Sequence, residues 1–238
     1  MMERLLYFSL LLCLVFTVQC YADEETRLKE MQIAANLSDK VSSRFETHLL
    51  FAYSQLGYTV FFDKIITGRA RKMVASGDLD ALMIAEKEIE EVYKDILRVP
   101  VVLARGSLIL YCNKEVECHA SALNNQNNTI GVISGNSISA NYMRHLKAST
   151  YTVKGSENLG LMLSKKRLDY ILLINGDKIG NLGGVDESLF QQVVINRTEG
   201  YHYIHNKHQH LFPQLTEALQ LAMEKLGPLV ELEAQASH

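Results

Sequence analysis

The pattern that most constrains this chain is an alternation of short apolar runs with longer stretches of helical periodicity. The run at residues 169–174 is continuously apolar after its first residue, which suits a strand buried on both faces of a sheet. In the last long stretch, Leu215, Leu219 and Ala222 recur at the spacing of one helix face. Strands that alternate with helices in this way indicate an α/β fold with a largely parallel sheet covered by helices.

The alternation runs through two similar cycles and then reverses. The first cycle has the layout of a βαβαβ unit, in which Gly57 and Gly77 are expected to end the helices. The second cycle begins near Arg105 and repeats this layout. We expect strands at residues 30–36, 58–62, 79–85, 107–112, 129–133, 150–153, 169–174 and 191–196, and helices at 42–56, 68–76, 139–146, 157–166 and 209–226.

Two such units would form two lobes joined by ordered chain. With only 3 Pro and 14 Gly in 238 residues, no segment has the composition of a flexible linker. The candidate crossings are residues 99–105 and 188–196, so lobe 1 would comprise 23–103 and 192–238, and lobe 2 would comprise 104–191. A double crossing of this kind makes a hinge, with a cleft in which helix N-termini can bind anions.

Residues 1–22 have the pattern of a secretory signal peptide. A short basic start precedes an apolar run at 5–18 that is too short to cross a bilayer comfortably. Cleavage after Ala22 would place Cys20 at the −3 position and leave an acidic start. An uncleaved anchor, or a lipid on Cys20, remains an alternative. The favoured interpretation places the mature protein in the periplasm.

Composition excludes some classes of partner. The 24 basic and 27 acidic residues give a net charge of -3, which offers no general attraction for the phosphates of nucleic acids. Hydrophobic residues make up 47% of the chain, enough for a substantial core. We therefore expect no nucleic-acid partner, and we expect the mature chain to be soluble because no later stretch is apolar enough to span a membrane.

Two cysteines remain after removal of the signal peptide. Cys112 and Cys118 would close a short loop in an oxidising compartment, so they form either a disulfide or two free thiols. Two thiols without further ligands do not make a zinc site. A metal is also not expected at the four histidines near the C-terminus, because their spacing fits no single helix face and no acidic or thiol partner is near: His202, His205, His208 and His210.

Several segments together carry a family resemblance. Residues 68–81 read Gly-Arg-Ala-Arg-Lys-Met-Val-Ala-Ser-Gly-Asp-Leu-Asp-Ala, an Arg-led helix that ends in a Gly-x-x-Asp turn. Residues 130–137 contain a glycine turn between strand and helix, and 166–170 lead into a later strand. With 96–100 and 201–208, these segments resemble in order and spacing the bacterial extracellular solute-binding proteins of family 3, over residues 28–227. The resemblance implies the two-lobed type II periplasmic-binding-protein fold and no cofactor. It also implies a monomer that binds a small molecule and is served by a membrane permease or a sensor.

The chain departs from the amino-acid binders of that family at two positions. Those proteins hold the ligand carboxylate with an Arg after the third strand, where residues 84–88 here read Ile-Ala-Glu-Lys-Glu. They hold the ligand ammonium with an Asp at the end of a later strand, where this chain has Asn175, with Asp177 two residues beyond. Because unpaired charges in a closed cleft are costly, an ordinary amino acid is not the expected ligand.

Three segments supply the candidate ligand contacts. An arginine at the start of a helix would meet an anionic group, or it is a surface residue. Small residues in a strand-to-helix turn would cradle an oxyanion, or they only cap the helix. Polar residues after a buried strand would face the ligand, or they form a turn. These candidates are Arg69, then Ser134, Gly135, Asn136 and Ser137, and finally Asn175 and Asp177.

The predicted function is capture of a small polar or anionic ligand in the interlobe cleft, for transport or sensing. No nucleophile elbow, P-loop or supported Cys–His pair appears in the sequence, so no catalytic residue is assigned. Two alternatives remain: a small dehydratase-like periplasmic enzyme on the same scaffold, and an interaction module that has lost its ligand.

Overall fold

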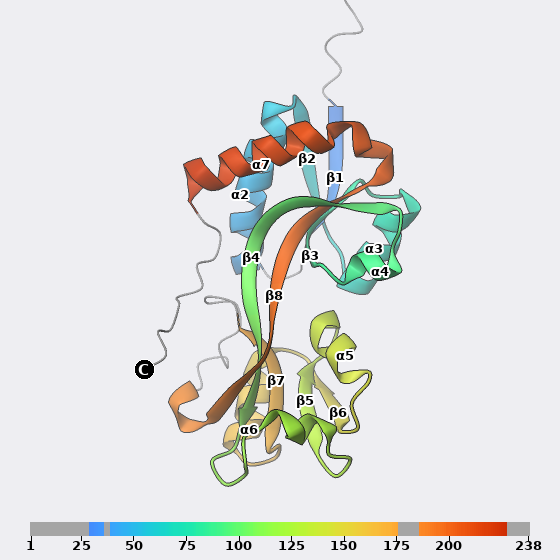
Figure 1. Ribbon diagram of the computed structural model, residues 1–238. Helices are drawn as coiled ribbons and strands as arrows, with labels where there is room; N and C mark the ends of the chain where they lie inside the picture. Colours follow the sequence, from blue (N-terminus) through green and yellow to red (C-terminus); the bar gives the residue numbers. More distant parts are fainter. Residues whose placement is uncertain (1–28, 36–38, 176–185, 228–238) are drawn as a thin grey trace, which may run out of the picture.

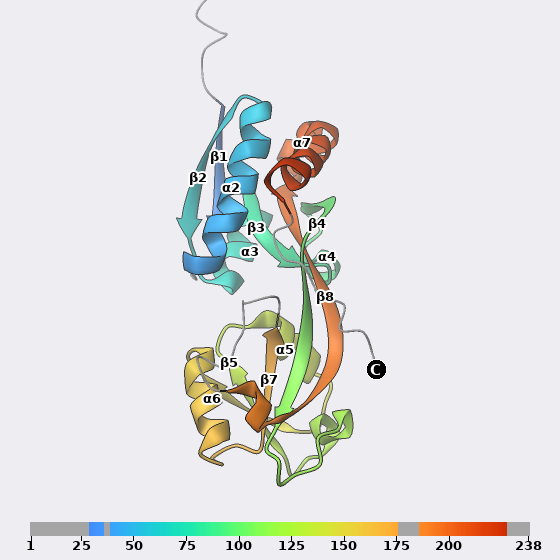
Figure 2. The same cartoon turned by 90° about the vertical axis from the view of Figure 1, so that its left-hand side faces the viewer.

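The computed structural model describes residues 29–35, 39–175 and 186–227, which form two lobes connected by a pair of long strands (Figure 1). The view turned by 90° shows the same separation into two bodies (Figure 2). The predicted α/β class and two-lobed architecture are confirmed. The predicted signal peptide and Asp177 lie outside the described residues.

Lobe 1 is a mixed sheet with helices on both faces. Its strands β1 and β2 are parallel, as are β1 and β3, and β8 then pairs antiparallel with β3. The elements that belong to this lobe alone are β1 (Lys29–Ala35), α2 (Asp39–Gln55), β2 (Tyr58–Lys64), α3 (Thr67–Ser76), β3 (Ala81–Glu86), α4 (Ile89–Val92), the 3-10 helix η3 (Asn206–Leu211) and α7 (Phe212–Leu226).

Alternation along the strands distributes the core of lobe 1 between the two faces of the sheet. Met31 and Ile33 join a cluster with α2 and α7, whereas Ala34 joins a cluster with α3 and α4. The helices end where glycines were predicted to end them. Gly57 and Gly77 have φ of +75° and +83°, a left-handed conformation that glycine adopts at little cost.

Lobe 2 repeats this arrangement around a smaller sheet. Leu108 and Leu110 pack with α5 on one face, and Ile109 and Tyr111 pack with α6 on the other. Cys112 and Cys118 form a disulfide in this lobe, with their Cα atoms 5.5 Å apart. The lobe contains the 3-10 helix η1 (Ala120–Asn124), β5 (Thr129–Ile133), α5 (Ser137–Met143), β6 (Ser149–Val153), α6 (Ser156–Ser164), β7 (Tyr170–Asn175) and the 3-10 helix η2 (Glu187–Leu189).

The two lobes share the long antiparallel strands β4 (Ile96–Cys112) and β8 (Gln191–His205). Through these strands the described chain forms one hydrogen-bonded sheet in the order β2-β1-β3-β8-β4-β7-β5-β6. Only residues 107–112 and 191–196 of the pair were predicted as strand. The segments that cross between the lobes therefore continue the hydrogen-bonded pairing of β4 with β8.

The predicted position of the second crossing, 188–196, is wrong. Within β8, Val194 pairs with Ile109, and Gln191 pairs with Cys112, which also pairs with β7, so these residues belong to lobe 2. The chain crosses at 198–200, where Gly200 pairs with Ala104. The boundary predicted at residues 191 and 192 therefore moves downstream, because Val193 and Ile195 pack against the core of lobe 2. No helix in the described part of the chain has the length and apolar content needed to cross a membrane.

Candidate functional site

A cavity of about 300 Å³ lies between the lobes, beside the crossing strands, and is called the inner cavity below. Its floor comes from β4 and β8, one wall from β3 and α3, and the other from β5, α5 and β7. Most of the lining is apolar, including Met83, Ile84, Ile138 and Leu173. Its charged side chains are Arg71, Glu86, Arg105 and Glu199.

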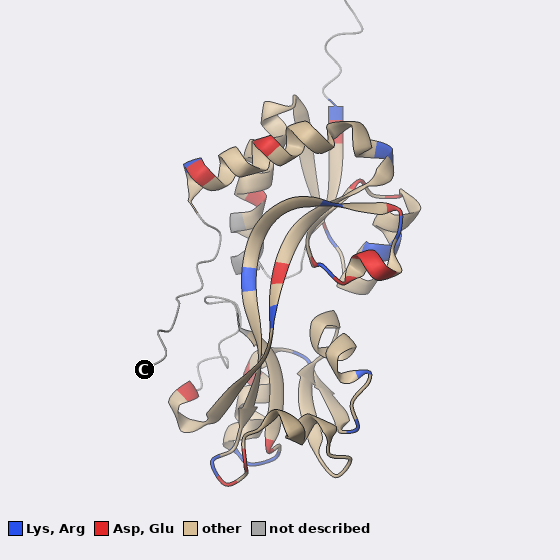
Figure 3. Ribbon diagram, viewed as in Figure 1, with Lys and Arg blue, Asp and Glu red and all other residues tan. Residues whose placement is uncertain are grey.

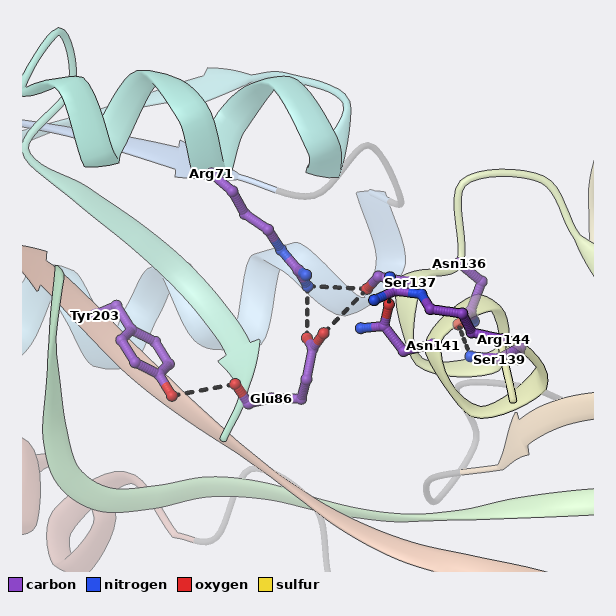
Figure 4. Close-up of polar contacts among 8 residues, drawn as sticks. All are labelled: Arg71, Glu86, Asn136, Ser137, Ser139, Asn141, Arg144 and Tyr203. Carbon is purple, nitrogen blue, oxygen red and sulfur yellow. Dashed lines mark hydrogen bonds and ion pairs between the residues drawn. The ribbon is translucent and has the colours of Figure 1, made fainter. Parts of the chain in front are cut away.

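Arg71 and Glu86 form an ion pair at the centre of this site (Figure 4). Arg71 Nη2 donates to Glu86 Oε2 at 2.5 Å, and the two residues are 7% and 6% exposed. The arginine is buried because α3 packs on the sheet through Ala70 and Val74, and residue 71 lies beside them on the same side of the helix. Each charge therefore has an opposite charge in contact, which a buried charge requires.

This ion pair reaches across the cleft to lobe 2. Arg71 Nη2 also donates to Ser137 Oγ at 2.9 Å, and Ser137 Oγ donates to Glu86 Oε1 at 3.2 Å. Arg71 and Glu86 come from lobe 1, whereas Ser137 is the first residue of α5 in lobe 2. The three side chains, named the interlobe triad below, thus connect the two walls of the cleft.

The backbone of Glu86 is held in place by a second residue of lobe 1. The Tyr203 hydroxyl donates to the backbone carbonyl of Glu86 at 3.1 Å, and Tyr203 is fully buried in β8. Burial raises the pKa of Tyr203, and nearby Glu90 raises it further, so the hydroxyl remains a donor. The end of β3 is therefore fixed with respect to the crossing strands.

The predicted glycine turn does meet the cleft. Gly135, Asn136 and Ser137 line the inner cavity, whereas Ser134 is not in its lining and donates its backbone N–H to Val153 at 2.8 Å. Asn136 Oδ1 accepts from the backbone N–H of Ser139 at 3.0 Å, so this side chain serves as the N-cap of α5. Ser137 contributes its side chain to the interlobe triad.

The other predicted contacts are distributed differently. Arg69 is exposed and does not line the inner cavity. Two residues along an α-helix turn by about 200°, so Arg69 leaves α3 on the side away from Arg71. Asn175 is the last residue of β7 and pairs with Ser107, but its side chain, like Asp177, lies outside the described part of the chain.

A second ion pair, which sequence reasoning missed, lies at the crossing. Arg105 Nε donates to Glu199 Oε1 at 3.2 Å from the facing strand, and the Tyr201 hydroxyl donates to Glu199 Oε2 at 2.5 Å. The Tyr201 hydrogen bond, followed by that of Arg105, lowers the pKa of Glu199. Arg98 stacks over the Tyr201 ring at 4.7 Å. The residues of this cluster belong to β4 and β8, and the pairing between these two strands is known only from the fold.

The histidines near the C-terminus make structural contacts. His202 is fully buried and its Nε2 lies 2.8 Å from the Tyr53 hydroxyl, while His208 Nε2 lies 2.7 Å from Asp80 Oδ1. Within the described ranges, no group of three or more His, Cys, Asp or Glu side chains could hold a metal ion. Chemically, the inner cavity offers apolar walls and two ion pairs that are each neutral in sum.

Comparison with known proteins agrees with this geometry. No protein-family profile matches the sequence, and no curated protein sequence matches it. Solved structures do match over most of the chain. The chain has the periplasmic-binding-protein fold.

Three solved structures illustrate the likeness. An ancestral amino-acid-binding protein, a precursor of cyclohexadienyl dehydratase, has a TM-score of 0.63 at 14% identity, covering 87% of this chain and 95% of that chain. A histidine kinase sensor domain with similarity to periplasmic binding proteins has a TM-score of 0.65 at 11% identity, covering 85% and 93%. A mutant of ArgBP from T. maritima has a TM-score of 0.61 at 10% identity, covering 87% and 94%. At these identities the likeness shows the fold, so the ligand must be argued from the cleft.

Proposed function

We propose that this chain is a periplasmic solute-binding protein whose lobes close over a small ligand in the inner cavity. The observation that carries the proposal is the interlobe triad, because a nearly buried ion pair of lobe 1 is hydrogen-bonded to a side chain of lobe 2. Such a contact can form only when the lobes are close together. The shared strands β4 and β8 provide the hinge around which they would separate.

The size and lining of the inner cavity support a small ligand. A volume of about 300 Å³ is at the lower end of the range of small-molecule sites. The apolar walls would contact the body of the ligand, and the polar groups of the triad would orient it. The structural neighbours include a transporter's substrate-binding protein and a kinase sensor domain, and both roles are compatible with ligand-driven closure.

The carboxylates of the inner cavity favour binding over acid–base chemistry. Glu86 accepts from Arg71 and Ser137, and Glu199 accepts from Arg105 and Tyr201. A general base needs a free oxygen and a pKa near the working pH, whereas the pKa of Glu199 is lowered. Both carboxylates therefore act as structural partners of their arginines.

The proposal is tested by ligand screening. Melting the purified protein against a metabolite library should identify a compound that raises the melting temperature, because a ligand present at 100 times its Kd stabilises by about 2.7 kcal/mol. For a chain of this size that corresponds to a rise of about 5–10 °C. The Kd of each hit is then measured by calorimetry.

Matched variants locate the bound compound. Ser137→Ala removes the lobe 2 member of the triad and should weaken binding, whereas Arg69→Ala changes an exposed residue of α3 and should leave the Kd unchanged. If no library compound shifts the melting temperature, or if both variants bind like the parent protein, the proposed function is wrong.

A further inference from the structure

The cleft continues on the far side of the interlobe triad. There a second hollow of about 620 Å³, the outer compartment, lies between the start of α3 and the surface formed by β5, α5 and β6. Arg71 and Ser137 are among the residues that line both spaces, so the two spaces adjoin at these side chains, a boundary called the partition below. Ile66, which is 64% exposed, lies at the lobe 1 edge of this compartment.

The outer compartment has a one-sided charge. Arg71 and Arg144 are the charged residues of its lining within the described chain, and none of its described lining residues is acidic. The inner cavity, by contrast, pairs each arginine with a glutamate. Figure 3 shows basic residues in the segment that follows α5. Since Glu86 neutralises Arg71, the uncompensated positive charge comes from Arg144.

The polar groups of α5 share one face. Ser137, Asn141 and Arg144 follow each other at i, i+4 and i+7, which places them along one side of the helix. Arg144 Nη2 donates to Asn141 Oδ1 at 2.7 Å, and Ser137 Oγ accepts from Arg71 at 2.9 Å. Figure 4 shows this row, with Arg71 reaching it from the opposite lobe. The asparagine thus orients the arginine beside the partition.

Donors for an anion surround this position. Arg71 lines this compartment, and its Nη2 makes the hydrogen bonds found within the described chain, to Glu86 and Ser137. Hydroxyl side chains complete the lining, since Thr67 begins α3 and Thr150 and Thr152 lie on one face of β6. An oxyanion between two arginines and several hydroxyls receives the hydrogen bonds that a carboxylate or a phosphate requires.

We propose that the outer compartment binds the anionic group of the ligand, a carboxylate or a phosphate, between Arg144 and Arg71. This inference rests on the proposed function and deepens it: the ligand's body occupies the inner cavity, and its oxyanion lies on the outer side of the triad. Arg144 is the residue that sets the preference for an anion, because its charge has no acidic partner in the described lining.

The test uses inorganic phosphate and succinate as probes, each titrated calorimetrically into the purified protein at constant ionic strength set with sodium chloride. At least one probe should bind with a Kd in the millimolar range or below. Arg144→Gln should weaken that binding by about tenfold or more. Binding of phosphate alone identifies a phosphate site, and binding of succinate alone identifies a carboxylate site; both results support the proposal.

The control is Lys147→Gln, which removes the same charge from an exposed residue that does not line the compartment. It should bind the probes like the parent protein. The proposal is overturned if neither probe binds, if Arg144→Gln binds as the parent does, or if Lys147→Gln weakens binding equally. Because Arg144 is exposed, the variant should fold, and its melting temperature without probe verifies this. If the probe titrations fail while a library compound still binds, only the anion site is overturned. If the library screen fails while a probe still binds, only the inner-cavity function is overturned.

Discussion

Arg71 and Glu86 contribute to the cleft in a way that depends on both being present. Two nearly buried charges that satisfy each other cost little, whereas either one alone would lack a counter-charge in a site that water reaches poorly. The ion pair therefore serves to fix the positions of the two side chains more than to add net stability to the fold. Stability measurements on variants can separate these two roles.

Removing one partner should be more damaging than removing both. Glu86→Leu leaves Arg71 without its counter-charge and should lower the free energy of unfolding by about 3 kcal/mol. The double variant Arg71→Met with Glu86→Leu replaces the pair by apolar groups and should recover most of that loss. Urea unfolding of the parent, both single variants and the double variant gives the coupling free energy. A double variant as unstable as the sum of the single variants would contradict this account.

His202 should make the protein sensitive to acid. Burial lowers the pKa of His202 from 6.5 to about 4, and its contacts with Tyr53 and Met83 fit the neutral ring. Below pH 6.5 His202 is protonated in the unfolded chain, whereas in the folded protein it stays neutral down to about pH 4. Stability should therefore fall between these values, by about 3 kcal/mol in total, and change little from this cause above pH 6.5.

The measurement is the free energy of unfolding between pH 7 and pH 4. His202→Gln should remove this part of the pH dependence, while His145→Gln, at an exposed histidine of lobe 2, should retain it. Equal slopes for the parent and His202→Gln would show that another group carries the effect.

The sequence predicts the segment that holds the buried arginine but selects the wrong residue. Arg69 was chosen because it leads the helix, yet Ala70 and Val74 define the buried side of α3, and Arg71 lies next to them. That helical spacing was available in the sequence as a signal. The ion pair between Arg71 and Glu86 could not be predicted in this way, because two residues 15 positions apart meet only when a helix packs on a strand.

At the level of elements, the crossing strands shape the inner cavity through a close approach. Gly200 of β8 faces Ala104 of β4, and a Cβ at residue 200 would lie 2.5 Å from Ile84 Cδ1. Any side chain there must displace Ile84, which lines the inner cavity. The glycine therefore keeps the floor of the cavity open.

Gly200→Ala should reduce ligand affinity by more than it reduces stability. The methyl group should cost about 1–3 kcal/mol of unfolding free energy through overpacking, and the displaced Ile84 should narrow the cavity. Adding Ile84→Ala should restore binding of a library compound. Ser164→Ala, at an exposed serine of α6 that lines neither space, is the control and should bind normally. Calorimetric Kd values for the four variants test this, and unchanged affinity in Gly200→Ala would refute it.

Periodicity predicted the short strands better than the two long ones. The strand predicted at 129–133 matches β5, because Ile130 and Val132 are bounded by an Asn-rich loop and a glycine turn. In β4 and β8 the burial pattern changes as the strand passes from one lobe to the other, so a single period does not describe it. The predicted ranges of both strands were therefore too short.

For the whole molecule, the triad should set the balance between closed and open forms. Its lobe 2 member makes two hydrogen bonds to lobe 1, from Arg71 and to Glu86. One net hydrogen bond contributes about 1 kcal/mol, which changes a two-state ratio about fivefold.

Ser137→Ala should therefore shift the unliganded protein toward the open form. The expected result is a larger radius of gyration by small-angle X-ray scattering, reversed by a saturating ligand. Ser164→Ala, an exposed serine of α6 outside the cleft lining, should scatter like the parent. Identical scattering for Ser137→Ala and the parent would mean that the triad does not control closure.

The two shared strands also determine how the chain can assemble during synthesis. Lobe 2 is built from uninterrupted chain, whereas β3 of lobe 1, which pairs with β1 on one edge, gains its second neighbour only when residues 201–204 have been made. The core of lobe 1 is likewise completed only when Leu215 and Leu219 of α7 have been made. A nascent chain halted before residue 200 should thus hold an unpaired β3 edge and an uncovered apolar face, so aggregation should compete most strongly with folding until residues 200–219 have been synthesised.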